Sequence, residues 1–221
     1  MKIISLIIFM TLLVGCSTST TIDEYRANDG NIELGEDEKV VVLGRRHAGR
    51  YETEPDFINC IGDKMGNGGS ISVLDETRFI NSLYPWFEPR TAPLKLSRMK
   101  YMMSEPLLRD SIQRTGVRYM IWVDGTTETL ERGGSISCAV GPGGGGCFGF
   151  ATWDKGSSYE ATIWDLKEMD SEGQVRVDAN GTSYMIAVGA PIPFIARVQA
   201  QACEGIAKQL REFFEQEPEE P

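Results

Sequence analysis

The sequence predicts an α/β fold in which a single mixed β-sheet is packed with amphipathic helices in a sandwich-like arrangement. Three observations lead to this class. A continuous apolar run at residues 39–44 is followed by helix and strand patterns in alternation. Residues 117–179 then contain several strand-like segments punctuated by Gly and Ser. Finally, residues 195–214 carry apolar side chains at helical spacing, as a helix lying on a sheet does.

The first half of the domain alternates between strand and helix. Residues 39–44 read Lys-Val-Val-Val-Leu-Gly, which is typical of a strand covered on both faces. Residues 55–65 place apolar side chains at helical spacing, with Pro55 in the first turn and glycines after the last turn. The remaining elements are expected at residues 70–74 (strand), 76–84 (helix, stopped by Pro85) and 104–115 (helix, capped by Ser104 and closed by Gly116).

The second half reads as β-structure followed by one long helix. Apolar and β-branched residues predict five strands, at residues 117–125, 135–140, 147–153, 159–166 and 174–179. The helix over residues 195–214 is the clearest amphipathic pattern in the chain. We therefore place one domain at residues 39–214, followed by an acidic tail at residues 215–221.

Composition agrees with a folded, exported domain. The chain has 221 residues, of which 41% are hydrophobic, and 24 glycines indicate many turns. Its formal net charge of −10 repels nucleic acid, so a nucleic-acid partner is not expected. No spacing of Cys and His suggests a metal site, and no motif suggests a cofactor.

The N-terminus resembles the lipobox of bacterial lipoproteins. Lys2 is followed by a short apolar run and by Leu-Val-Gly-Cys ending at Cys16. The alternative of a transmembrane helix needs about 20 apolar residues, more than this run supplies. The resemblance implies a signal peptide at residues 1–15, acyl chains such as palmitate on Cys16, and, because Ser17 is not Asp, an outer-membrane location facing the periplasm.

Residues 16–38 are expected to form a flexible linker after the lipidated cysteine. They are rich in Ser and Thr, then acidic, and show no apolar periodicity. A flexible chain of this length spans about 25 Å on average, which would lift the domain off the membrane.

The other four cysteines form an even set, as expected in an oxidising compartment. Three pairings are possible, and the chain favours Cys138 with Cys147, which flank a glycine-rich loop, and hence Cys60 with Cys203. The alternative is four buried free thiols, since Cys also packs as a small hydrophobe.

The order of elements is similar to one group of periplasmic lipoproteins. The succession resembles the group that includes the curli secretion channel protein, the penicillin-binding-protein activator LpoB and the amino-terminal domain of TolB. It consists of residues 40–43, the helix over residues 56–65, residues 71–75, 116–121 and 159–166, and the last helix. The resemblance covers residues 39–214 and implies that the helices carrying Cys60 and Cys203 lie side by side.

One basic segment stands out in this acidic chain. Arg45, Arg46, His47 and Arg50 follow the first strand and could bind a phosphate or carboxylate group of a ligand or partner. The alternative is a solvated loop whose arginines pair with nearby Asp and Glu. His47 is the single histidine, and no nucleophile motif accompanies it.

The glycine run at residues 141–146 is expected to be a flexible hairpin tip. Phe148 and Phe150 beside it could dock into a partner or another copy, or could pack in the core. The two strands that flank the loop, at six or seven residues each, are shorter than the about 9–11 residues that cross a membrane.

Two functions follow from these observations. The first is a lipid-anchored, non-catalytic protein that binds an envelope protein or assembles with itself at the outer membrane. The alternative is an envelope enzyme acting on cell-wall or glycan material, although the sequence lacks an evident nucleophile or metal constellation for it.

Overall fold

The chain forms two compact units in a computed structural model, which describes residues 18–27, 32, 34–47, 50–51, 53–88, 92–93 and 95–215. Unit 1 contains residues 18–19, 128–156 and 180–198, and unit 2 contains the other described residues. The signal peptide, Cys16 and the acidic tail after residue 215 lie outside the described residues. Among the described helices, none is both long and apolar enough to span a membrane.

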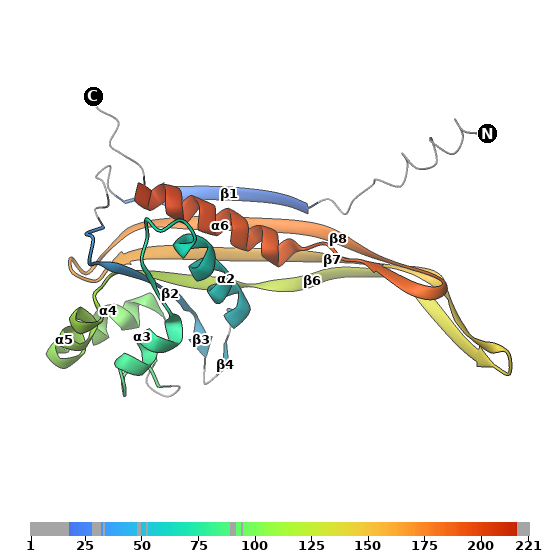
Figure 1. The fold of residues 1–221 in the computed structure, drawn as a ribbon, viewed down its shortest axis with the longest axis horizontal. Coiled ribbons are helices and arrows are strands. Elements are labelled where there is room, and N and C mark those ends of the chain that lie inside the picture. The colour runs from blue at the N-terminus through green and yellow to red at the C-terminus, as the bar shows by residue number, and fades with distance from the viewer. Residues whose placement is uncertain are drawn as a thin grey trace, which may run out of the picture. The chain divides into compact units, whose positions relative to one another are not determined.

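A six-stranded sheet in the order β1-β8-β7-β6-β2-β5 organises the fold (Figure 1). Strand β2 (Lys39–Gly44) pairs in parallel with β5 (Val73–Leu74) and with β6 (Val117–Gly141). Strands β6 and β7 (Gly144–Asp165) are joined by a two-residue turn, which makes them an antiparallel hairpin. The sheet is therefore mixed, as predicted, although β5 is shorter than the strand expected at residues 70–74.

Three long strands replace the five short ones expected in the second half. These are β6, β7 and β8 (Asp170–Phe194). The sequence prediction was wrong because glycines that read as turns lie inside the strands. Gly134 and Gly149 have positive φ, and a Cβ on either would collide with a carbonyl oxygen of the opposite strand. Glycine here permits close backbone approach and leaves the strands unbroken.

The expected linker is wrong for residues 18–26, which form β1 (Thr18–Arg26) at the edge of the sheet next to β8. Thr, Ile and Tyr favour strands, although the segment is too polar to show an apolar pattern. Within unit 2, Ile22 of β1 packs against the long helix, since a Cβ on Gly205 would be 3.0 Å from its Cδ1.

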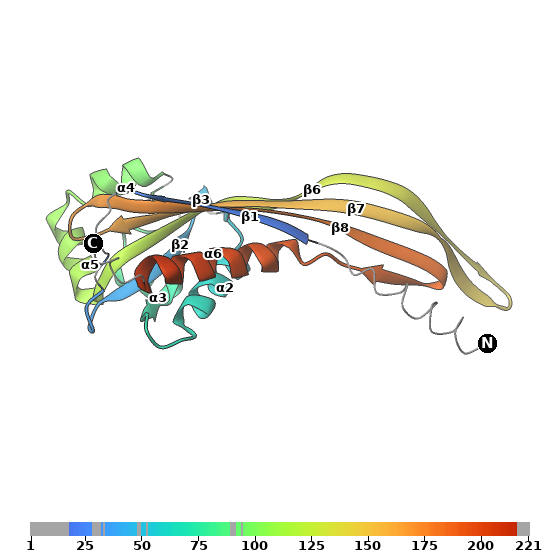
Figure 2. The ribbon, with the colours of Figure 1, turned by 90° about the horizontal axis from the view of Figure 1, so that it is seen from above.

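Helices cover both faces of the sheet in unit 2, as the predicted sandwich requires. Figure 2 shows α4 (Leu96–Met102) on one side, and α2 (Pro55–Gly66) and α6 (Val198–Glu215) on the other; α5 (Pro106–Thr115) shares a core cluster with α4. One core cluster joins α3 (Glu76–Ser82), α4 and α5 to the sheet. Its largest members include Phe79, Leu83, Met103, Leu108, Met120, Trp122 and Trp164.

Helix ends follow local signals with one exception. Asp75 caps α3 by accepting a hydrogen bond from the Arg78 amide, and Gly116 closes α5 in the left-handed conformation. The predicted cap at Ser104 is wrong, because its hydroxyl donates to the Tyr101 carbonyl oxygen at 2.6 Å at the end of α4. Helix α5 begins instead at Pro106, whose fixed φ suits the first turn.

Candidate functional site

Unit 1 brings together two stretches of chain that carry no charge. Residues 133–153 and 180–196 contain no Asp, Glu, Lys, Arg or His, whereas 24% of the whole chain is Asp, Glu, Lys or Arg. The charged side chains in the described part of unit 1 lie outside these stretches, at residues 128, 131, 132, 154, 155 and 197. This distribution is visible in the sequence, but only the fold shows that the two stretches belong to one unit.

Residues 133–153, the first of the two uncharged stretches, form a tight hairpin without a long loop. Strand β6 ends at Gly141 and β7 begins at Gly144, so Pro142 and Gly143 alone make the turn. The expected hairpin tip is present, but the six-residue loop expected at residues 141–146 is wrong, because Gly141, Gly144, Gly145 and Gly146 are strand residues. The flanking strands of six or seven residues expected from the sequence are also wrong, because β6 has 25 residues and β7 has 22. Their length therefore no longer argues against crossing a membrane.

A disulfide joins the two strands near the turn. Cys138 and Cys147 face each other across the hairpin with a Cα–Cα distance of 4.0 Å. The pairing is the one that the sequence favoured, and it excludes the free-thiol alternative for these residues. Because the bond closes a short ring, the chain-entropy model assigns it about 3 kcal/mol.

Large apolar side chains form an exposed face on β7 and β8 of unit 1. Phe148 and Phe150 alternate along β7, and their exposed fractions are 66% and 48%. On β8, Ile186 and Val188 alternate with exposed fractions of 42% and 78%. Tyr184 joins the two sets, because its ring stacks on Phe150 with centroids 6.2 Å apart.

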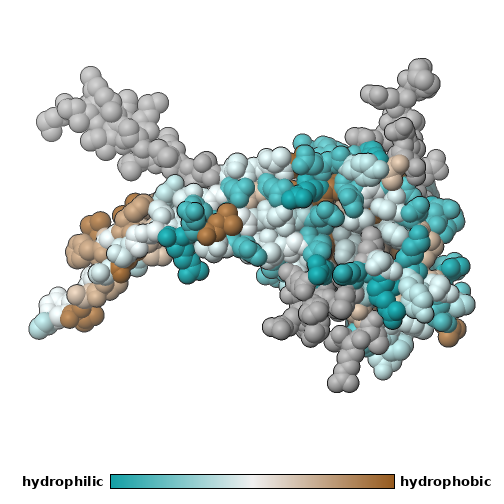
Figure 3. Space-filling view, turned by 180° about the vertical axis from the view of Figure 1, so that it is seen from behind, coloured by the Kyte–Doolittle hydropathy of each residue, from teal (hydrophilic) through white to brown (hydrophobic). Residues whose placement is uncertain are grey.

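Side chains two apart in a strand point to the same side of a sheet. We therefore treat Phe148, Phe150, Tyr184, Ile186 and Val188 as one surface, the apolar face of unit 1. Of the two alternatives for the phenylalanines, core packing is wrong and exposure is observed. In Figure 3, hydrophobic residues gather over the ends of these strands.

The opposite side of β8 is covered by the chain that returns toward α6. Ser183 is fully buried, and its hydroxyl oxygen accepts a hydrogen bond from the Ala196 amide at 3.1 Å. Ala187 is also buried. The exposed residues of the apolar face are therefore on the side of β8 that this segment leaves open.

One edge of β6 is unpaired in unit 1. Strand β2 pairs with β6 only over residues 117–123, and among the described residues no other strand adjoins that edge. Residues 128–141 thus present a row of backbone N–H and C=O groups. Long free edges of this kind are templates for strand addition by another chain.

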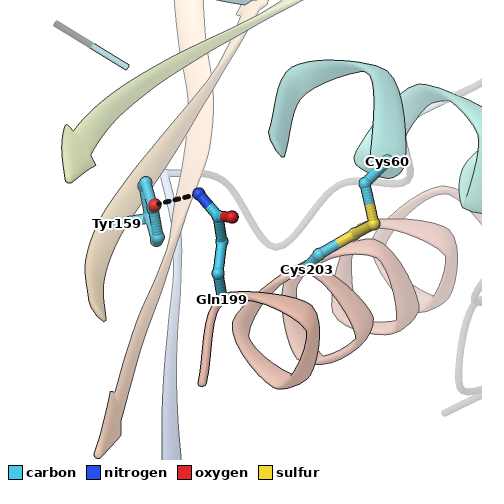
Figure 4. The surroundings of a disulfide bond; sticks show 4 residues. All are labelled: Cys60, Tyr159, Gln199 and Cys203. Atoms are coloured by element: carbon cyan, nitrogen blue, oxygen red, sulfur yellow. Dashed lines mark hydrogen bonds between the residues drawn. A yellow bond between two sulfur atoms is a disulfide. The ribbon is translucent and has the colours of Figure 1, made fainter. Parts of the chain in front are cut away.

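Unit 2 holds the second disulfide, which links α2 to α6 (Figure 4). Cys60 and Cys203 have a Cα–Cα distance of 6.3 Å, within the normal range for a disulfide. The pairing favoured by the sequence is again present, and the two helices lie side by side on the sheet, as the family resemblance implied.

A part-buried polar cluster ties β6, β7, α6 and the residue before α2 together in unit 2, next to this disulfide. The Tyr159 hydroxyl donates to Glu54 at 2.9 Å, contacts the Thr127 hydroxyl at 2.7 Å and accepts from the Gln199 amide at 3.3 Å. The Tyr159 ring stacks on Phe57 with centroids 3.6 Å apart. Burial raises the pKa of Tyr159 to about 12, so the phenol stays protonated and can donate.

An ion pair fixes the beginning of β6 to the end of β7. The Arg118 guanidinium contacts both carboxylate oxygens of Asp165, the shorter distance being 2.6 Å. Asp165 is buried, and its hydrogen bond raises the pKa of Arg118 above its already high value. Asp165 also accepts from the Lys167 and Glu168 amides, so this carboxylate caps the turn after β7.

The predicted basic patch divides into two parts. Arg45 pairs with Asp124 at 2.7 Å, which is the solvated ion pair of the alternative interpretation. Arg46 and His47 form β3 (Arg46–His47), and Arg50 begins β4 (Arg50–Tyr51), as a separate two-stranded sheet. The side chains of Arg46, His47 and Arg50 lie outside the described residues, so their proposed ligand contact stays a prediction.

Two carboxylates, Asp124 and Asp165, lie on strands β6 and β7 in unit 2. Asp165 is the last residue of β7, whereas Asp124 lies inside β6, and each is engaged by an arginine. No group of three or more His, Cys, Asp or Glu side chains in the described ranges could hold a metal ion.

Comparisons with known proteins give structural likeness only. No family model matches the chain, and no curated protein matches it. A solved structure titled "PelC dodecamer from Paraburkholderia phytofirmans" has a TM-score of 0.41 and 13% identity, covering 90% of this chain and 100% of that one. A putative neuraminyllactose-binding hemagglutinin homolog from Helicobacter pylori has a TM-score of 0.38 and 12% identity, covering 87% and 96%. The resemblance to the curli-channel, LpoB and TolB group stays a prediction.

Proposed function

We propose that the protein is a lipid-anchored envelope protein of the outer membrane, facing the periplasm, and that it acts without catalysis. It binds another envelope protein or further copies of itself. The observation that carries this proposal is the free edge of β6 at residues 128–141. The lipobox at Cys16 supports the anchor, and the two disulfides fit an oxidising compartment.

The β6 edge suits strand addition for a physical reason. Soluble proteins usually protect a long edge strand with Lys, Pro or a covering element. Here residues 133–141 have no charge and no proline, and no described strand covers them. A partner strand would satisfy the backbone groups of this edge, and its affinity would come from main-chain hydrogen bonds.

Photo-crosslinking in cells tests this proposal. Benzoylphenylalanine placed at Glu131, which is exposed on the β6 edge, should capture one protein or a ladder of copies of the chain. The matched control is Tyr101, which is 69% exposed on α4 of unit 2 and should capture neither. Equal capture at both positions, or none at Glu131, would argue against the edge as a protein contact.

Acylation is measured separately, by mass spectrometry of the mature N-terminus. The expected species begins at Cys16 with acyl chains on its sulfur and amino group. A chain that keeps residues 1–15, or a Cys16 without lipid, would refute the anchor while leaving the edge contact open.

A further inference from the structure

We infer that the apolar face of unit 1 rests on the lipid bilayer that holds the acyl chains of Cys16. This inference rests on the proposed lipid anchor and goes further, because it assigns an occupant to a surface that the β6 edge contact does not use. Three observations support it. They are the length of the tether, by which we mean the chain between Cys16 and Thr18, the place where this tether joins the fold, and the charge distribution.

The tether between lipid and fold is very short. Strand β1 begins at Thr18, so only Ser17 separates it from Cys16. A chain reaches at most about 3.6 Å per residue, so Thr18 lies within about 7 Å of the acylated cysteine. The fold cannot be lifted off the membrane as a linker through residue 38 would allow.

The tether joins unit 1 itself. Thr18 belongs to this unit, and its Cγ2 is 2.7 Å from the position that a Cβ on Gly181 would take. Gly181 is in β8, three residues before Tyr184 and seven before Val188. At about 3.3 Å per residue, the apolar face therefore begins about 10 Å from the end of the tether and extends to about 23 Å.

The charge distribution favours lipid as the occupant. A chain of net charge −10 is repelled by anionic headgroups, so a stable approach needs a surface without charge. Residues 133–153 and 180–196 supply that surface, with exposed Phe, Ile and Val side chains. The short tether holds this surface at the membrane at high local concentration.

The depth of contact follows from the β6 edge. Unpaired backbone groups cannot enter the hydrocarbon core of a bilayer without a hydrogen-bond partner. The sheet of a single copy should therefore lie at the boundary of headgroups and acyl chains, where apolar side chains reach about 5–10 Å inward. Phe148 and Phe150 are side chains of the kind that enter the acyl-chain side of this boundary, and the Tyr184 ring beside Phe150 carries a hydroxyl that suits the headgroup side.

Depth-dependent fluorescence quenching tests the inference on the full, acylated chain. Val188→Cys is labelled with an environment-sensitive dye, which is selective because Cys60, Cys138, Cys147 and Cys203 are in disulfides. The protein is reconstituted in phosphatidylcholine and phosphatidylglycerol vesicles that contain nitroxide-labelled lipids. The control is Tyr101→Cys, an exposed position on α4 of unit 2.

The expected result is a blue-shifted emission at residue 188 and quenching at least threefold stronger than at residue 101. Similar quenching at both positions, or none at residue 188, would overturn the inference. Shielding of residue 188 by a crosslinked protein without lipid quenching would overturn it as well. If Cys16 carries acyl chains and residue 188 is unquenched, the inference fails alone; if Cys16 is not acylated, the proposed anchor fails first.

Discussion

Removing the Cys60–Cys203 disulfide tests how unit 2 is held together. The two cysteines are 143 residues apart in sequence and join α2 to α6. In the chain-entropy model, a loop of that length gives about 5 kcal/mol of stability by restricting the unfolded chain. The bond between Cys138 and Cys147, 9 residues apart, gives about 3 kcal/mol by the same relation. Total stabilities of about 5–15 kcal/mol make either loss measurable.

The assay is urea unfolding followed by circular dichroism, on the Cys60→Ala/Cys203→Ala and Cys138→Ala/Cys147→Ala double variants. We expect the first to lose about 2 kcal/mol more than the second, because the larger loop leaves more unfolded-state entropy unrestrained. Unfolding of the Cys138→Ala/Cys147→Ala variant with and without reductant isolates the Cys60–Cys203 bond, because this variant has no other disulfide among the described residues and keeps the buried Cys203 side chain. A smaller loss in the Cys60→Ala/Cys203→Ala variant would refute the reasoning.

Three further predictions concern single residues. Asp165→Asn should lower the free energy of unfolding by about 2 kcal/mol, because it removes the buried carboxylate and leaves Arg118, among the described residues, with Glu38 alone, at 3.5 Å; thermal unfolding measures this. Wild-type stability should fall as pH rises from about 10 to about 12, because the unfolded chain loses its Tyr159 proton at the ordinary pKa while burial keeps the folded pKa near 12. Tyr159→Phe should reduce that fall, as measured by urea unfolding at several pH values. Gly149→Ala should destabilise the protein by about 1–3 kcal/mol, because its φ of +142° is strained for alanine and the new Cβ would meet the Ser135 carbonyl.

Each of these predictions has a matched control. Asp178→Asn removes the partner of Arg176, an exposed ion pair, and should change stability by less than about 1 kcal/mol. If Asp165→Asn lowered the free energy of unfolding by no more than Asp178→Asn does, the burial of Asp165 would not be what makes its ion pair stabilising. Tyr101→Phe, at an exposed position, should leave the alkaline fall unchanged. Gly143→Ala, with nothing within 4 Å of the new Cβ, should be tolerated far better than Gly149→Ala.

Local patterns predicted the elements that depend on near neighbours. The apolar run Lys39–Gly44 is strand β2, and the helical spacing over residues 55–65 becomes α2, which ends at Gly66. The cysteines around the hairpin form the expected disulfide. These features arise from side-chain period and short-range geometry, which a sequence carries directly.

Other features depend on contacts made far along the chain. Helix α4 escaped prediction, although Met99 and Met103 place it in the core. Phe148 and Phe150 could be core or surface residues, because an apolar pattern does not say which face a neighbour covers. The polar cluster around Tyr159 had no signal either, since its members Glu54, Thr127 and Gln199 come from distant segments.

The sequence by itself determined the acidic balance, the uncharged stretches and the class of fold, because each depends on residue type or on local periodicity. The signal peptide and the lipobox at Cys16 stay predictions from the sequence. Only the tertiary structure decided that Thr18 begins a strand, that Gly134 and Gly149 continue strands, and that β6 keeps a free edge. The reason is that glycine and polar residues take their conformation from the strand beside them. Strand pairing is a long-range contact, and it alone brings Thr18 and the uncharged stretches into one unit.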